Sequence, residues 1–408
     1  MKSLSSLCCL YLFILFVSCT KESGTGAPPS TDSFTVTVNN GYGSGKYKTG
    51  DTVHIFSNAY MEDQVFGNWS SDISLLNDAG EWHAWFVMPG KNVSLTGHIK
   101  SIAPFTLQYE QVKGRDRLKP VYYYFPEGHD GIVYLLHGTS GSAANIVNDY
   151  EWQQLIKDLV SNHFAVIITE AEESTTGKDE NGDGKIRWNL LPYDSTLNVD
   201  YANIRIITDT FYNRGLAKRS EPRYSVGMSD GGFFSAALSS LYHFKAEVQY
   251  CSQGSTNVLQ STTVPVQFCM ARSDSNPDVG AAGNAAALSF SNSLNARGVC
   301  SQYLINERSP IYPERFARSG SLTNDQSASV FAELKANGFV DDKNYFITYS
   351  DSLTAALQND PEKFPVLKSL SLHQRLAVLE QIDIAVADHH IYSDYDGATV
   401  KFLMNQCQ

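Results

Sequence analysis

The sequence predicts an α/β protein in which a largely parallel sheet covered by helices follows a small all-β unit. From about residue 101 onward, short apolar runs of strand length alternate with helical patterns, as in a sheet of this kind. Residues 34–100 instead carry alternating strand patterns separated by turns rich in Gly and Asn. The 408 residues suffice for one large domain and a smaller one.

Composition narrows the range of functions. The formal net charge of -12 argues against a nucleic-acid partner, which requires a basic surface, and against attraction to an anionic membrane surface. A hydrophobic content of 42% and an aromatic content of 12% are enough for packed domains. We therefore expect an acidic globular protein.

The N-terminus resembles the signal of a bacterial lipoprotein. Lys2 precedes the apolar run Leu7 to Val17, which is too short to span a bilayer but suits a signal peptide. The run ends in Phe16-Val17-Ser18-Cys19, which resembles a lipobox except that Phe16 stands where Leu is usual. The resemblance implies a signal peptide over 1–18, a palmitate-type lipid on Cys19 and anchoring to a membrane of the bacterial cell envelope. An ordinary signal peptide cut nearby is the alternative.

A tether and a β module follow the predicted lipid anchor. Residues 19–33 are rich in Gly, Ser, Pro and Thr and are predicted to be flexible. Residues 34–100 resemble a single internalin-type B repeat, which implies a small β-grasp-like module that usually serves as a spacer or adhesive appendage. The resemblance rests on Gly45-Lys-Tyr-Lys-Thr-Gly-Asp-Thr-Val53, Phe66-Gly-Asn-Trp69 and Phe86-Val-Met-Pro-Gly-Lys-Asn-Val-Ser94.

Residues 101–408 form the predicted large domain. The strand candidates are short apolar runs: Ile132 to Leu136, Ala165 to Thr169, Tyr224 to Val226, Ala246 to Tyr250, Val264 to Phe268 and Ser301 to Ile305. The helical patterns between them include Tyr201 to Arg214 and Ala285 to Arg297. Residues 322–385 are rich in helix formers at amphipathic spacing and predict a helical insertion.

The segment Gly227-Met-Ser-Asp-Gly231 fits the G-x-S-x-G pattern of a nucleophile elbow, with Ser229 as the candidate nucleophile. It lies between a predicted strand and a predicted helix. This context suits the motif, because small flanking residues allow a tight turn that exposes the serine.

The strand Ile132 to Leu136 runs into His137-Gly-Thr-Ser-Gly141, which resembles the His-Gly loop of α/β-hydrolases. Together with the elbow, it makes the chain resemble the secreted polyhydroxybutyrate-depolymerase and feruloyl-esterase branch of that superfamily. The resemblance implies an α/β-hydrolase sheet with residues 322–385 as a cap. It also implies an oxyanion hole formed by the backbone of Thr139 or Ser140 and that of Asp230.

The same resemblance implies an acid and a histidine after the serine. Asp274 lies just past a strand, where the family places its acid, and Asp278 is its rival. We favour His389 as the base, because Asp388 precedes it, and His390 is the alternative. Adjacent residues of an extended loop point to opposite sides, so only one of the two imidazoles can face Ser229.

Two further predictions concern bonds that stabilise the fold. Cys300 begins the last strand and Cys407 ends the last helix, so both should lie at the end of the sheet away from Ser229 and could form a disulfide, with reduced thiols as the alternative. Asp179, Asn181 and Asp183 match the start of a calcium loop, which Asp194 could complete. Leu190 stands where that loop needs an acid, so a solvated acidic loop is favoured over structural calcium. We expect no other metal or cofactor.

These features predict a serine carboxylester hydrolase that acts on an ester in the periplasm or outside the cell. Two alternatives remain at this stage. One is a surface lipoprotein that binds a glycan or polymer without catalysis, and the other is a peptidase on the same scaffold. The presence of a complete candidate triad favours the enzyme.

Overall fold

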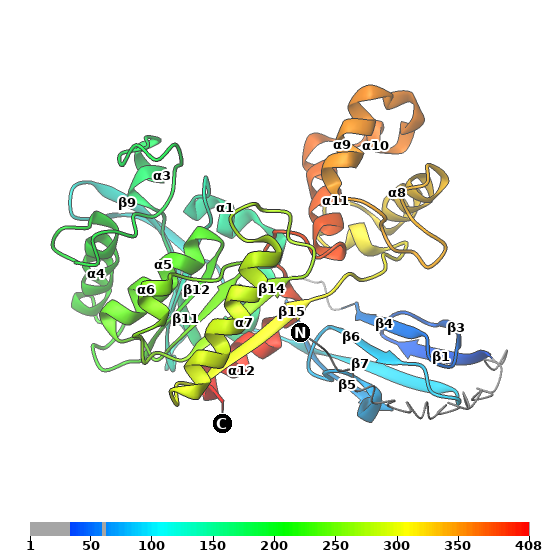
Figure 1. Ribbon diagram of the computed structural model, residues 1–408, viewed down its shortest axis with the longest axis horizontal. Coiled ribbons are helices and arrows are strands. Elements are labelled where there is room, and N and C mark those ends of the chain that lie inside the picture. The colour runs from blue at the N-terminus through cyan, green and yellow to red at the C-terminus, as the bar shows by residue number, and fades with distance from the viewer. Residues whose placement is uncertain (1–32, 59–62, 408) are drawn as a thin grey trace, which may run out of the picture.

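The computed structural model describes residues 33–58 and 63–407 (Figure 1). An eight-stranded sheet forms the large domain, in the order β15-β14-β13-β12-β10-β11-β9-β8. Its strands are β8 (Gln108–Lys113), β9 (Leu118–Tyr124), β10 (Gly131–Leu136), β11 (Phe164–Ile168), β12 (Arg223–Met228), β13 (Ala246–Tyr250), β14 (Val266–Ala271) and β15 (Ser301–Asn306). Neighbours from β11 to β15 are parallel, whereas β9 is antiparallel to both β8 and β11.

Helices cover both faces of this sheet. One face packs against α1 (Ala143–Asn148), α2 (Tyr150–Ser161) and α12 (Asp396–Asn405). The other packs against α4 (Val199–Asn213), α5 (Asp230–Tyr242), α6 (Thr256–Leu259) and α7 (Gly280–Ala296). Each predicted strand and helix has a counterpart here, although β14 begins and ends later than predicted.

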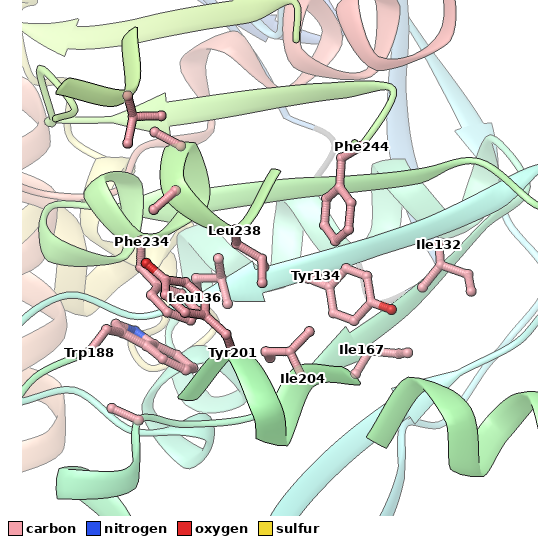
Figure 2. Packing of buried hydrophobic residues seen from close by; sticks show 14 of the residues in the cluster. Ile132, Tyr134, Leu136, Ile167, Trp188, Tyr201, Ile204, Phe234, Leu238 and Phe244 are labelled. Atoms are coloured by element: carbon pink, nitrogen blue, oxygen red, sulfur yellow. The ribbon is translucent and has the colours of Figure 1, made fainter. Parts of the chain in front are cut away.

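Strand β10 shows how the sequence builds these two layers. All six of its residues are buried, because alternate side chains face opposite helical layers. Figure 2 shows Tyr134 and Leu136 in one layer, with Leu136 near Phe234 and Trp188. Val133 packs in the layer on the other side.

The N-terminal strands form two further sheets. A four-stranded sheet contains β1 (Ser33–Asn39), β3 (Gly45–Lys48), β5 (Gln64–Ser71) and β7 (Val93–Ser101). A three-stranded sheet contains β2 (Gly41–Tyr42), β4 (Thr52–Ser57) and β6 (His83–Val87). They enclose a hydrophobic cluster around the fully buried Trp69, whose indole N–H donates to the Glu81 carbonyl at 2.9 Å.

The long segment between β15 and α12 is helical. It contains α8 (Asn324–Ala336), α9 (Ser350–Asn359), α10 (Pro365–Ser369) and α11 (Leu372–Ala385), which Figure 1 shows grouped beside the large sheet. These helices share a hydrophobic cluster of their own, which also includes Ile311 and Phe316 ahead of residue 322. Within the described ranges, no helix is long and apolar enough to cross a membrane.

The structure confirms the predicted pairing of Cys300 with Cys407, whose Cα atoms lie 5.7 Å apart. The bridge joins the start of β15 to the end of α12. Cys251 and Cys269 are buried and unbridged.

The carboxylate of Glu151, on α2, joins several parts of the chain. Its Oε1 accepts hydrogen bonds from Arg318 Nη1 at 2.5 Å and Gln381 Nε2 at 2.9 Å. Its Oε2 accepts from the Ser393 backbone N–H at 2.9 Å and the Ser393 hydroxyl at 2.6 Å. The Arg318 guanidinium lies 3.7 Å from the ring centroid of Trp82, in the N-terminal module. Burial disfavours the charge on Glu151, but Arg318 outweighs this and lowers the pKa of the carboxyl.

We expect Glu151→Ala to lower the free energy of unfolding by about 3–5 kcal/mol, because it removes a buried carboxylate that pairs with Arg318 and accepts four hydrogen bonds. Denaturant unfolding monitored by circular dichroism measures this quantity.

Glu307→Ala is the matched control. Glu307 pairs with Arg272 at 2.6 Å, but both side chains are about half exposed. Removing an exposed pair should change the free energy of unfolding by only about 0.5 kcal/mol. A loss below about 1 kcal/mol in Glu151→Ala would contradict the importance assigned to the buried carboxylate.

Candidate active site

Ser229 lies on the turn between β12 and α5, in an uncommon backbone conformation. Its φ is 56° and its ψ is -120°, a region that non-glycine residues rarely adopt. The Ser229 N–H donates to the Tyr250 carbonyl at 2.9 Å, which fixes the turn against β13. A strained turn from strand to helix is the geometry expected of a nucleophile elbow.

The glycines of the G-x-S-x-G motif are required by close backbone approach. A Cβ atom at Gly227 would lie 2.0 Å from the Gly231 carbonyl oxygen. A Cβ atom at Gly231 would lie 2.2 Å from the Leu136 carbonyl oxygen at the end of β10. Any larger residue at either position would therefore force the turn open.

The structure brings Ser229, His389 and Asp274 together. His389 Nε2 lies 2.9 Å from Ser229 Oγ, and His389 Nδ1 lies 2.8 Å from Asp274 Oδ2. The Asp274 side-chain carboxylate is fully buried, whereas the His389 side chain is 14% exposed. These contacts have the geometry of a nucleophile, a base and an orienting acid.

Asp388 fixes the loop that carries His389. Its Oδ1 accepts from the His389 N–H and from the Ser275 N–H, both at 2.7 Å. The Ser273 N–H also donates to the Ala387 carbonyl at 2.9 Å. The acid loop and the histidine loop are thus bonded to each other directly. In the sequence, Asp388 is recognisable only as part of the family pattern, and residue spacing does not reveal this bonding role.

The two rival residues lie elsewhere. His390 Nδ1 donates to the Ile391 carbonyl at 2.6 Å, and His390 Nε2 is 3.9 Å from Asp149. The Asp278 carboxylate forms an exposed ion pair with Lys185 at 2.6 Å. Neither occupies the position that His389 or Asp274 holds beside Ser229.

The His-Gly loop passes close to Ser229. A Cβ atom at Gly138 would lie 3.2 Å from the Ser229 Cβ atom. The Ser140 N–H donates to the Ile186 carbonyl at 2.7 Å, so this N–H is already occupied. Because of that bond, the Ser140 N–H is not available as an oxyanion donor, which corrects one of the two alternatives predicted from the sequence. Thr139, the residue after Gly138, and Asp230, the residue after Ser229, are left as the candidate backbone donors.

Two buried side chains position this loop. The His137 imidazole bonds the Gly138 carbonyl at 2.7 Å through Nδ1, and its Nε2 accepts from the Ala171 N–H at 3.1 Å. Burial lowers the pKa of His137 to about 4, so the ring is neutral at pH 7. The Trp188 indole N–H donates to the His137 carbonyl at 2.9 Å. No sequence motif had pointed to Trp188.

The side chain of Asp230 holds the segment that contains Trp188. Its Oδ2 accepts from the Trp188 N–H at 3.0 Å, and its Oδ1 is 3.6 Å from Arg187 Nη1. Burial raises the pKa of Asp230 to about 6. The carboxylate of Asp230 thus holds the segment that contains Trp188, whereas its backbone N–H is the candidate oxyanion donor.

The candidate calcium residues lie in an exposed loop that is held by its own hydrogen bonds. The Asp179 carboxylate accepts from the N–H groups of Gly182 and Gly184, both at 2.7 Å. Asp183 pairs with Arg187 at 2.6 Å, and the Asn181 side chain donates to Asn189 at 3.0 Å. Asp194 accepts from the hydroxyl of Thr196, within its own turn.

In the described part of the chain, Cys251, Asp274 and His389 place metal-ligand atoms within 4.8 Å of one another. Two of the three are already hydrogen-bonded in the arrangement around Ser229. Burial raises the pKa of the Cys251 thiol well above its ordinary value, and a protonated thiol is a poor ligand. Hydrogen bonding is thus enough to explain why these three side chains lie close together.

The N-terminal module contacts the chain that follows His389. The Trp82 indole N–H donates to the Ser393 carbonyl at 3.0 Å, and the His83 ring forms a buried hydrogen bond with Asp394. The Glu81 carboxylate accepts from the Ala398 N–H at 2.7 Å, at the start of α12. This module therefore packs directly against the segment between the histidine loop and the last helix.

Comparison with known proteins gives distant structural similarity only. No protein-family model and no curated protein matches the chain. A dienelactone hydrolase from Anabaena variabilis is 14% identical with a TM-score of 0.35, over 50% of this chain and 87% of that one. Naproxen esterase from Bacillus subtilis is 15% identical with a TM-score of 0.33, over 50% and 84%. An acylaminoacyl peptidase from Pyrococcus horikoshii is 12% identical with a TM-score of 0.35, over 62% and 43%.

Similarity at this level carries no argument about function. The sheet order, the helices on both faces and the strained serine turn are features of the chain itself. They define an α/β-hydrolase-like fold.

The charged groups around His390 make the free energy of unfolding depend on pH. Burial opposes protonation of His390, but the carboxylates of Asp149, Glu380 and Asp383 outweigh it and raise the pKa from 6.5 to about 9. A raised histidine pKa adds stability that is complete below pH 6.5 and is lost as the pH rises through about 9. We expect the free energy of unfolding to fall across this range, and to fall less in His390→Gln. Denaturant unfolding at a series of pH values measures both slopes, and equal slopes would contradict the prediction.

Proposed function

We propose that the protein is a serine carboxylester hydrolase with Ser229 as nucleophile, His389 as general base and Asp274 as orienting acid. The observation that carries the proposal is the continuous hydrogen-bonded path from Ser229 Oγ through both ring nitrogens of His389 to Asp274. An activated serine requires such a base, held in one tautomer by a third group.

In the proposed reaction, His389 Nε2 takes the proton from Ser229 Oγ as the oxygen attacks the ester carbonyl carbon. Asp274 stabilises the imidazolium that results. His389 then delivers the proton to the departing alcohol, and an acyl group remains on Ser229. A water molecule, deprotonated by the same ring, attacks the acyl-enzyme; the ring then returns the proton to Ser229 Oγ as the bond to the acyl carbon breaks, and the carboxylic acid leaves.

The oxyanion of each tetrahedral intermediate needs preformed donors. We assign this role to the backbone N–H groups of Thr139, in the His-Gly loop, and of Asp230, the residue after Ser229. Donors fixed by the surrounding backbone stabilise developing charge without reorganising. The bonds of His137 and Trp188 support the first of these groups, because they hold the loop that contains Thr139.

The helical insertion is proposed to be the cap of this site. It begins after β15, whose carboxyl end lies at the same end of the parallel strands as the serine turn after β12. Its last helix, α11, leads into the histidine loop. Insertions at this edge can shape a substrate pocket and exclude water.

Ser229→Ala should abolish covalent labelling by a fluorophosphonate probe, because only an activated serine reacts with it. Hydrolysis of p-nitrophenyl acetate should fall by at least about 1,000-fold. Labelling is read by in-gel fluorescence and hydrolysis by absorbance. A chain that binds a polymer without catalysis would label no better than its Ser229→Ala variant, and a peptidase would prefer amide substrates.

Asp274→Asn and Asp278→Asn form a matched pair that tests the acid. The first should lower kcat by about 100-fold or more, because the imidazolium loses its charged partner. The second removes an exposed ion pair and should leave kcat within about twofold. The reverse order of effects would overturn the assignment of Asp274.

We also propose that Cys19 carries a lipid that anchors the protein to a membrane of the cell envelope. Cys19 lies outside the described residues, so the proposal depends on the lipobox-like sequence alone. Labelling of cells with an alkyne-bearing palmitate should mark the wild type and not Cys19→Ala. Cys8→Ala, a change in the segment that is removed, should leave the label unchanged. Persistent labelling of Cys19→Ala would contradict the anchor.

A further inference from the structure

A cavity lies between the N-terminal module and the helical insertion, apart from the triad. Its volume is about 800 Å³, which is within the range of about 300–1,000 Å³ found for small-molecule sites. We call it the module cleft, and six residues define it: Tyr42, Tyr47, Thr52, Tyr312, Glu314 and Tyr345. No residue of the triad or the His-Gly loop is among those that line it.

Tyrosine rings held in fixed positions line the module cleft. Tyr42 and Tyr312 stack with centroids 4.6 Å apart and an angle of 19° between the ring planes. Tyr312 also packs on Phe56, with centroids 4.8 Å apart. The Tyr47 hydroxyl donates to the Gly43 carbonyl at 2.9 Å, which fixes a third ring. Rings that are already ordered lose little conformational entropy when a ligand stacks on them.

The fourth ring comes from the insertion. The Tyr345 hydroxyl lies 3.2 Å from His54 Nε2, on β4 of the module. Burial lowers the pKa of His54 to about 3, so this imidazole is neutral at pH 7. The contact joins the two walls of the cleft through an uncharged hydrogen bond.

The charged side chains around the module cleft are of both signs. Three are acidic and two are basic: Asp51, Glu314, Asp342, Lys46 and Lys343. Such a mixture has no strong preference for a polyanion, unlike the basic surface that nucleic acid requires. The lining also contains few aliphatic side chains, with Ile311 as the main one. An acyl chain would therefore find little apolar surface there.

We propose that the module cleft binds a neutral saccharide chain. The C–H faces of a pyranose ring are apolar and can stack on tyrosine rings, while its hydroxyls hydrogen-bond with carboxylates, ammonium groups and amides at the rim. Tyr42 and Tyr345 provide stacking surfaces from opposite walls, and Glu314 and Asn344 lie beside them as hydrogen-bonding groups. The site is formed by the module and the insertion together, so neither part alone contains it.

Isothermal titration calorimetry on the full chain bearing Ser229→Ala tests the proposal without turnover of any ligand. The probes are neutral oligosaccharides of glucose, xylose, mannose, galactose and N-acetylglucosamine. At least one should bind. Tyr42→Ala should weaken that binding about tenfold, the effect of losing one stacking contact of about 1.4 kcal/mol.

Thr52→Trp is the second variant, because Thr52 is exposed and a large ring there would fill the module cleft without removing a buried contact. Tyr109→Ala is the matched control, since Tyr109 is an exposed tyrosine on β8 and does not line the cleft. It should leave binding unchanged.

Three results would overturn the proposal. They are the absence of binding to every probe, binding unaffected by both Tyr42→Ala and Thr52→Trp, and binding of an extended peptide in place of any saccharide. The same cleft variants are also made with Ser229 intact, and their hydrolysis of p-nitrophenyl acetate is measured. This measurement distinguishes failure of the saccharide proposal from failure of the esterase proposal. Both cleft variants should keep that activity within about twofold, because they lie outside the triad.

Discussion

The buried carboxylate of Glu151 is the interaction on which much of the remaining structure depends. It accepts four hydrogen bonds, which come from α11, from the segment before α8 and from the chain just after the histidine loop. A buried charge is tolerated only when its partners are complete, so these segments have little freedom to shift independently. Arg318 extends the constraint to the N-terminal module through its contact with Trp82. Four parts of the chain are therefore fixed relative to one another near the loop that presents His389.

The serine turn shows a second constraint of this kind. The unfavourable backbone angles of Ser229 persist because β12, α5 and the end of β10 approach too closely for any alternative. Gly227 and Gly231 permit that approach, and the Tyr250 carbonyl holds the Ser229 N–H. Strain at the serine is thus balanced by packing of the sheet.

Local patterns in the sequence were enough to predict the parallel strands and the turn that carries Ser229, because each depends on short-range signals. Asp274 was preferred over Asp278 only through the family resemblance. Strands β8 and β9 were missed, since β8 is mostly polar and β9 contains Pro120. The choice between Thr139 and Ser140 could not be made from sequence, because it depends on the Ile186 carbonyl, which belongs to a distant loop. Trp188 and Glu151 escaped notice for the same reason: their partners are 51 and 242 residues away along the chain.

The adjacent histidines illustrate how tertiary contacts complete what the sequence leaves open. His389 is directed towards Ser229 by Asp274 and by the bonds of Asp388, all of which come from the loops after β14 and α11. His390 is directed the other way, towards Asp149 at the start of α2. Because the two side chains leave the loop on opposite sides, each contact restricts the rotation that would exchange them. The carboxylates around His390 therefore help to hold His389 in place without touching it, through the backbone that the two residues share.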